Sequence, residues 1–222
     1  RLGNDVAGKF LISELKKHNV NTEFIIQDQS ISPRLIENHK YETNSNIANH
    51  RFSLNCPNCH NVFSKYIAPT IKSVKLTLNK LKSPEFLFFD RLSPSTFKIL
   101  DYYKTEKTIF FFEPPKIKVN ENFFKAISFV HILKMAVNDK KEAYEIGNKL
   151  ISNLQIIPKL LLFTLGEEGI LVLFGDTLKW EHFPGIQSNY IVDTCGAGDW
   201  FSIGLIYSLR RIRKNFFLNN EY

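Results

Sequence analysis

The sequence lacks any apolar run of the roughly 20 residues that a membrane-spanning helix needs. Its first residues also lack the basic stretch followed by an apolar stretch that marks a secretory signal peptide. Cysteine is scarce, and three cysteines, an odd number, do not indicate a disulfide framework. These absences argue against a membrane protein and a disulfide-stapled secreted domain, so we expect a cytoplasmic protein with no membrane partner.

Internal repeats and low-complexity segments are absent as well. With 222 residues, 44% of them hydrophobic and 14% aromatic, the chain is long enough and apolar enough to bury one sizeable core. The formal charge of +7 is compatible with nucleic-acid binding. However, the basic residues are scattered in short pairs such as Lys16-Lys17 and Lys140-Lys141. We therefore expect a solvated basic surface that favours anionic nucleotides, and no nucleic-acid partner.

Short apolar segments alternate with amphipathic ones from about residue 70 onward. Apolar positions on one helical face also predict a helix within residues 2–18, and a short strand is expected at 20–26. Buried strands are expected at 86–89, 108–112, 129–133 and 159–164, helices at 71–81, 94–103, 120–127 and 140–153, and a hairpin from 170–174 and 177–182. This alternation predicts a parallel sheet covered on both faces, with ligands at the carboxyl ends of its strands.

The richest motif is the heptapeptide 193–199, Asp-Thr-Cys-Gly-Ala-Gly-Asp, which leads into an apolar segment typical of a buried helix. Two glycines let the backbone approach an anion closely, and the amides at a helix N-terminus point at that anion. A carboxylate directly after the turn is placed to take a proton from an attacking hydroxyl. The alternative is a helix with an aspartate cap and a glycine-rich entry turn.

The whole string resembles the DTxGAGD signature of the ribokinase-like (PfkB) carbohydrate kinases. Two further segments support the resemblance: residues 3–20 look like the family's GDDxxGxxLxxxLxxxGV segment, and residues 164–169 are similar to its T-x-G-x-x-G motif. The resemblance implies an α/β ribokinase-like fold, a mostly parallel sheet flanked by helices with a small β-lid. It further implies ATP-dependent phosphorylation of a hydroxyl on a sugar or nucleoside, with Mg²⁺ bridging the phosphates.

The same resemblance assigns roles to single residues. Asp199 matches the catalytic base, and Gly196, Ala197 and Gly198 match the anion hole that stabilises the transferring phosphoryl group. The nucleotide-binding positions of the family fall on five residues: Thr164, Gly166, Gly169, Asp193 and Thr194. For Asp193, a helix or turn cap is the alternative, and the two roles are compatible.

Several departures from the family pattern stand out. The opening strand and the Gly-Gly segment of complete members do not precede Arg1, and the chain stops soon after the expected helix, so we expect a form truncated at both ends. The Asn-x-x-Glu motif that organises magnesium and phosphate falls on Ala136 and Asp139. Asp139 is thus either a magnesium carboxylate or a helix N-cap.

Residues 27–66 are polar and are expected to form the lid, projecting from an incomplete core made of 1–26 and 67–222. Within them, Cys56-Pro57-Asn58-Cys59-His60 is a frequent zinc half-site, because such a turn aims two thiolates at one metal. His50, His60 or His39 would have to complete the four ligands of a Zn²⁺ site. The alternative is an incomplete knuckle with two reduced cysteines.

Two further expectations concern the lid. Arg51 either reaches a substrate oxygen from the lid or is an ordinary surface arginine. In the family this segment often forms the dimer contact, which predicts a homodimer through the lid.

Two other classes of function remain open. A non-catalytic nucleotide- or sugar-binding protein of this fold would tolerate the altered Asn-x-x-Glu motif. A zinc-knuckle nucleic-acid-binding module would use the basic charge. Asp199 favours the kinase over both, because neither of them needs a base at that position.

Overall fold

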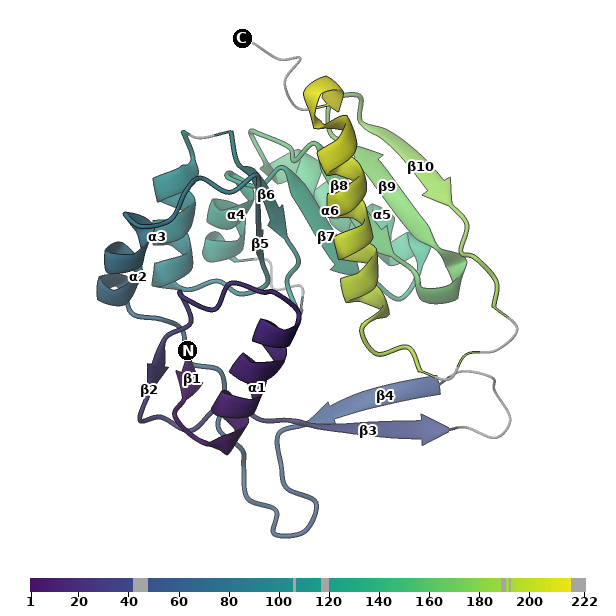
Figure 1. Cartoon of the computed structure of the whole chain (residues 1–222). Coiled ribbons are helices and arrows are strands. Elements are labelled where there is room, and N and C mark those ends of the chain that lie inside the picture. The colour runs from purple at the N-terminus through teal and green to yellow at the C-terminus, as the bar shows by residue number, and fades with distance from the viewer. Residues whose placement is uncertain (42–47, 106, 117–119, 189–190, 192, 217–222) are drawn as a thin grey trace.

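The computed structural model describes residues 1–41, 48–105, 107–116, 120–188, 191 and 193–216. Its centre is a six-stranded sheet in the order β10-β9-β8-β7-β6-β5 (Figure 1). Strands β5 to β8 are parallel, and β9 and β10 continue the sheet in antiparallel fashion. The strands are β5 (Phe86–Phe89), β6 (Ile109–Phe112), β7 (Ile132–Ala136), β8 (Leu160–Thr164), β9 (Ile170–Phe174) and β10 (Lys179–Phe183).

Helices cover both faces of this sheet, as the alternation in the sequence predicts. One face packs against α2 (Ile71–Leu78), α3 (Pro94–Tyr103), α4 (Glu121–Ile127) and α5 (Lys140–Asn153). The other face packs against α6 (Ala197–Phe216), which crosses in front of the sheet in Figure 1.

Strand β6 explains how the sheet can be buried on both sides. All four of its residues are apolar and buried, and their side chains alternate between the two faces. Phe110 and Phe112 pack with α2–α5, whereas Ile109 and Phe111 pack with α6. Each such phenylalanine contributes about 1.5–3 kcal/mol by its burial. The two hydrophobic layers therefore fix the register of the sheet and the position of α6.

The four helices α2 to α5 each begin directly after a residue whose side chain caps the helix N-terminus. Thr70, Ser93, Asn120 and Asp139 are their N-caps, and each side chain accepts a hydrogen bond from an amide in the first turn. Pro94 follows its cap at the first helical position, where a missing N–H costs nothing. The predicted helices are confirmed, with starts within one residue, although α2 ends at Leu78 rather than residue 81.

Two predicted strands differ from the structure. Residues 20–26 form no strand and include a turn at Glu23-Phe24, because Asn19 adopts a φ of 58° and the Asn21 side chain accepts a hydrogen bond from the amide of Glu23. The strand expected at 129–133 is β7 at Ile132–Ala136, shifted by three residues toward the C-terminus. The apolar run had suggested an end before Lys134, but the strand continues through this lysine, which is buried.

The N-terminal part forms a separate small unit. Strand β1 (Leu2–Gly3) pairs in parallel with β2 (Gln27–Asp28), and α1 (Val6–Lys17) lies against them. Asp5 caps α1 and also accepts hydrogen bonds from Ser32 and Arg34, and the Ser32 hydroxyl bond is the main cause that holds the pKa of Asp5 well below its usual value. The segment from residue 27 thus begins with a strand of this unit before it enters the lid.

The segment predicted to form the lid contains an antiparallel hairpin of β3 (Ile36–Tyr41) and β4 (Ala48–Ser53), and we keep the name lid for it. In Figure 1 it projects below the end of the main sheet where the turn before α6 also lies. Across the described residues, no helix is both long enough and apolar enough to pass through a membrane.

Candidate functional site

The turn before α6 lies at the carboxyl edge of the parallel strands (Figure 1). Its backbone is held by its own residues: the Asp193 carboxylate accepts the amide of Cys195 at 2.8 Å, and the Thr194 carbonyl accepts the amide of Ala197 at 3.2 Å. Gly196 has a φ of 78°, a left-handed conformation that favours glycine. The sequence therefore folds into a tight turn that opens directly into α6.

The first turn of α6 has amide donors and a carboxylate on its exposed side. Trp200 donates its amide to the carbonyl of Gly196 at 2.9 Å, but within the described part of the chain the amides of Gly198 and Asp199 donate to no acceptor. The side chain of Asp199 is exposed beside them. Open amides at a helix N-terminus favour an anion. Of the residues predicted for the anion hole, Gly198 offers such an amide beside Asp199, whereas the amide of Ala197 donates to the carbonyl of Thr194.

The lid reaches this turn through Glu37, at the start of β3. Its side chain forms a hydrogen bond with the thiol of Cys195, and this carboxylate is the main reason why the pKa of Cys195 is raised to about 11. The negative charges of Asp193 and Asp199 act in the same direction. The turn is thus held between the end of the sheet and the lid.

The second predicted motif, residues 164–169, is the connection between β8 and β9. Thr164 ends β8, and Gly166 and Gly169 have φ values of 59° and 94°. A Cβ on Gly169 would lie 2.2 Å from the carbonyl oxygen of Phe183, so this turn packs tightly against the end of β10. The turn lies at the same end of the sheet as the start of α6 (Figure 1).

Asp139 lies at the same edge, after β7. Its Oδ1 accepts the amide of Glu142 at 2.8 Å and caps α5, while Glu142 accepts the backbone and side-chain N–H groups of Asn138. The capping interpretation of Asp139 is therefore confirmed, and its role toward magnesium stays a prediction. Mg²⁺ bound largely through phosphates needs only one or two carboxylates, and the exposed Asp139 and Asp193 fit that requirement.

A buried ion pair behind the turn was not predicted from the sequence. Lys134, in β7, is 1% exposed, and its Nζ lies 2.5 Å from Oε1 of Glu113, which follows β6. The same Nζ donates to the carbonyl of Gly198 at 2.7 Å and to the hydroxyl of Ser202 at 2.9 Å. A lysine inside an otherwise apolar strand is the signal that could have indicated this cluster.

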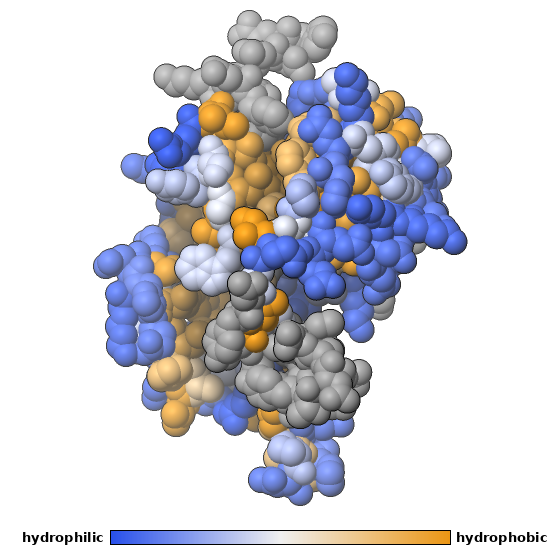
Figure 2. All heavy atoms as spheres, turned by 90° about the vertical axis from the view of Figure 1, so that its right-hand side faces the viewer, coloured by the Kyte–Doolittle hydropathy of each residue, from blue (hydrophilic) through white to orange (hydrophobic). Residues whose placement is uncertain are grey.

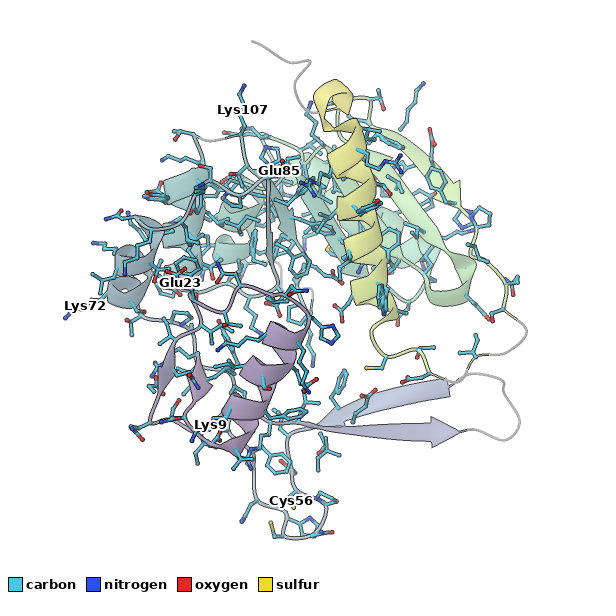
Figure 3. The ribbon with its side chains drawn as sticks, in the orientation of Figure 1. Lys9, Glu23, Cys56, Lys72, Glu85 and Lys107 are labelled. Atoms are coloured by element: carbon cyan, nitrogen blue, oxygen red, sulfur yellow. The ribbon has the colours of Figure 1, made fainter. Side chains whose placement is uncertain are left out.

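The Cys-Pro-x-Cys segment folds as a knuckle at the outer tip of a loop. Cys56 donates its amide to Asn61 and accepts the amide of His60 at its carbonyl, while amides of Cys59 and Asn58 point at its sulfur and lower its pKa. In Figure 3 the labelled Cys56 lies at the far end of the loop from the main sheet.

Zinc ligands beyond the knuckle were also predicted. Among the residues that the structure describes, no three His, Cys, Asp or Glu side chains come together as a metal site. The side chains of His39, His50 and Arg51 lie outside the described ones, so their predicted roles stay predictions.

Comparison with known proteins finds a family match in the C-terminal part of the chain. Residues 114–215 match the model of the pfkB family carbohydrate kinases. This range contains both predicted nucleotide-side motifs and the buried Lys134. A comparison with curated proteins finds no match.

Solved structures show the fold. A nucleoside kinase from Burkholderia thailandensis in complex with inosine matches with a TM-score of 0.66 and 16% identity, covering 94% of this chain and 64% of that one. Ribokinase from Giardia lamblia matches with a TM-score of 0.66 and 16% identity, covering 96% and 66%. Aminoimidazole riboside kinase from Salmonella enterica, complexed with its riboside and an ATP analogue, matches with a TM-score of 0.64 and 18% identity, covering 95% and 69%.

The chain thus spans about two thirds of the length of these structures. The predicted α/β fold with its mostly parallel sheet is confirmed. Residues 114–215 match the pfkB family of carbohydrate kinases, and the chain as a whole has the ribokinase-like fold.

Proposed function

We propose that this protein transfers the γ-phosphoryl group of ATP to a hydroxyl of a sugar or nucleoside. The observation that carries the proposal is the first turn of α6, where the exposed Asp199 carboxylate follows amides that have no acceptor in the described part of the chain. A general base beside an anion-binding helix terminus is what phosphoryl transfer to an alcohol requires.

In the proposed reaction Asp199 takes the proton of the acceptor hydroxyl as this attacks the phosphorus. The open amides of Gly198 and Asp199 hold the charge that develops on the transferring phosphoryl group, beside the rest of the 196–198 turn. Magnesium, held through the phosphates with Asp139 or Asp193 near it, would neutralise part of the phosphate charge.

The nucleotide would be contacted from the β8–β9 turn by Thr164, Gly166 and Gly169. Thr194 would shape the turn before α6.

The lid fits the acceptor side of this site. Glu37 already brings β3 against Cys195 in the turn, so a sugar or nucleoside held there would be enclosed between lid and sheet. Enclosure excludes water and suppresses hydrolysis of ATP without an acceptor. We also propose Arg51 as a lid residue that reaches the acceptor, a homodimer contact through the lid, and a cytoplasmic location.

A second proposal concerns the knuckle. The backbone of residues 54–63 is folded as a hairpin, with the amide of Phe63 donated to Leu54 and a bridge between Asn55 and Val62. Cys56 and Cys59 are therefore held on one short turn, as two ligands of a zinc ion would be. We propose that Zn²⁺ binds there and stabilises the lid, with His50 or His60 among its other ligands.

The kinase proposal is tested by acceptor-dependent conversion of ATP to ADP with a panel of sugars and nucleosides. We expect turnover with at least one acceptor, and a loss of about 100-fold or more in Asp199→Asn, since general base catalysis contributes roughly 10²–10⁴-fold. Asp176→Asn is the matched control, because Asp176 is an exposed carboxylate in the β9–β10 turn that pairs with Lys159. If the wild type and both variants bind ATP but none of them turns it over, the protein would instead be a nucleotide-binding protein without catalysis.

A further inference from the structure

The charged cluster around Lys134 is built to hold one specific peptide group. The ammonium group of Lys134 has three N–H donors, and the structure gives each of them an acceptor: Glu113, Gly198 and Ser202. The Ser202 hydroxyl in turn donates to the second carboxylate oxygen of Glu113 at 2.6 Å. The positive charge also lies 5.5 Å from the centre of the Phe201 ring.

These contacts join three elements. Lys134 belongs to β7, Glu113 follows β6, and Gly198 and Ser202 lie in the first two turns of α6. The lysine is almost completely buried, whereas the Glu113 side chain is 23% exposed. A buried ammonium group whose hydrogen bonds are all satisfied is held rigidly. Any movement away from its acceptors would leave a polar group unpaired in a medium of low polarity.

The contact with Gly198 has a directional consequence. The carbonyl of Gly198 and the amide of Asp199 belong to the same peptide group, which is planar and trans. Their C=O and N–H bonds therefore point in opposite directions. Because Lys134 holds the carbonyl oxygen of Gly198 at 2.7 Å, the amide of Asp199 points to the opposite side of the peptide group, away from the lysine.

We propose that Lys134, together with Glu113, is a positioning residue that sets the direction of the Asp199 amide and so orients the anion hole. The inference rests on the proposed function for its catalytic consequence, but the orientation itself is a property of the fold. It also explains Gly198, which lies within α6 and has no left-handed backbone: a Cβ there would lie 3.3 Å from Nζ of Lys134 and 3.7 Å from Oε1 of Glu113. The second glycine of the motif makes room for the ammonium group.

The test must separate positioning from stability. Lys134→Met alone leaves the Glu113 carboxylate without its cation, so this variant is expected to lose stability. The double variant Glu113→Leu/Lys134→Met removes both charges and replaces them with apolar groups, which restores much of the stability but not the hold on Gly198. Lys159→Met, which breaks the exposed pair with Asp176, is the matched control.

Two readouts are needed for these variants. The first is hydrogen exchange of the amides of residues 200–204 compared with those of β6 and β8. In the double variant we expect exchange to rise at least tenfold at 200–204 and to stay unchanged in the two strands. The second is kinetic: kcat should fall about 100-fold, as small misplacements of catalytic groups do, while the KM for ATP stays within about threefold.

The outcomes distinguish the two proposals. If the double variant exchanges and turns over as the wild type does, the positioning role is wrong. It is also wrong if exchange rises equally in all elements, or if the double variant does not fold, because the pair would then serve the fold as a whole. If the wild type has no turnover, the proposed function fails, and the hydrogen exchange alone decides whether Lys134 orients the turn.

Discussion

Glu37 of the lid and Cys195 of the turn before α6 share a hydrogen bond between carboxylate and thiol. The two residues are far apart in the sequence, and their contact joins the β3–β4 hairpin to the place where we expect phosphoryl transfer. Because the thiol of Cys195 reacts with alkylating reagents, its rate of reaction can report on this contact directly.

The reactivity of Cys195 should depend on Glu37. The thiolate is the reactive form, and with a pKa of about 11 only about 0.1% of Cys195 is ionised at pH 8. Replacing the carboxylate in Glu37→Gln removes the main cause of the raised pKa, so we expect iodoacetamide to label Cys195 at least tenfold faster. The background is Cys56→Ser/Cys59→Ser, which leaves Cys195 as the single thiol.

Glu23→Gln is the control for this labelling experiment, because Glu23 is an exposed glutamate outside the lid hairpin. It should leave the rate unchanged. Equal rates in Glu37→Gln and the parent would show that the lid carboxylate does not govern the thiol.

The two glycines of the turn should respond to alanine for different reasons. Gly196 has open space where a methyl group would lie but a φ of 78°, so Gly196→Ala costs about 1–2 kcal/mol of unfolding free energy through backbone strain alone. Chemical denaturation of the variant measures this cost. Gly204→Ala, which adds a methyl group in open space within α6, is expected to be neutral or stabilising.

Gly198→Ala should instead be coupled to Lys134. The added methyl group meets the ammonium at 3.3 Å, so its cost should shrink in the Glu113→Leu/Lys134→Met background. A double-mutant cycle on the unfolding free energy should give an interaction of at least about 0.5 kcal/mol. Strict additivity would mean that the methyl group is accommodated without moving the lysine.

Stability should fall in mild acid because of His131. Burial lowers the pKa of His131, and its Nδ1 accepts the amide of Phe110 at 3.0 Å, which requires the neutral ring. Below the unfolded-state pKa of about 6.5 the unfolded chain binds a proton that the folded chain does not, so stability decreases as the pH falls. The slope from this one group is at most about 1.4 kcal/mol per pH unit.

His131→Asn tests this assignment, because asparagine keeps an acceptor for Phe110 and cannot titrate. Denaturation curves at pH 7 and pH 5.5 should differ less in the variant than in the wild type. His182→Asn, at an exposed position on β10, should retain the wild-type pH dependence, and an unchanged dependence in His131→Asn would point to another group.

Zinc binding at the knuckle has a clear spectroscopic test. Cobalt(II), added to the reduced protein in place of zinc, should give thiolate charge-transfer bands and the intense visible absorption of a tetrahedral site. Cys56→Ser and Cys59→Ser should each abolish them, whereas Cys195→Ser should not. Absence of the bands in the parent protein would show that the two cysteines are simply reduced thiols.

The sequence predicted the sheet and its helices well because local rules determine them. Strand β6 is apolar at all four positions, and caps such as Ser93 lie directly before their helices. The 193–199 motif likewise predicted the tight turn that leads into α6, since its glycines and aspartates act through backbone geometry over a few residues.

The polar cluster behind the turn could not be found in this way. Lys134 and Glu113 are 21 residues apart, and Lys134 and Gly198 are 64 apart, so only the folded sheet shows that they meet. The same lysine caused the misplaced end of β7, because a charge usually ends a buried run. Three exposed apolar or aromatic residues on α6 were also not anticipated, namely Trp200, Ile203 and Tyr207. Figure 2 shows a band of hydrophobic surface that runs down the middle of the face it presents, between hydrophilic regions.

The long sequence separations within this cluster also bear on how the protein folds. The bond between Ser202 and Glu113 closes a loop of 89 residues, and the bond between Lys134 and Gly198 closes one of 64. Such closures are entropically costly and are favourable only once the intervening strands have paired. The sheet can therefore assemble before the turn is ordered. We expect a partly folded chain to have the paired strands but to lack the contacts that hold the start of α6, so the proposed site would be the part of the molecule that forms late.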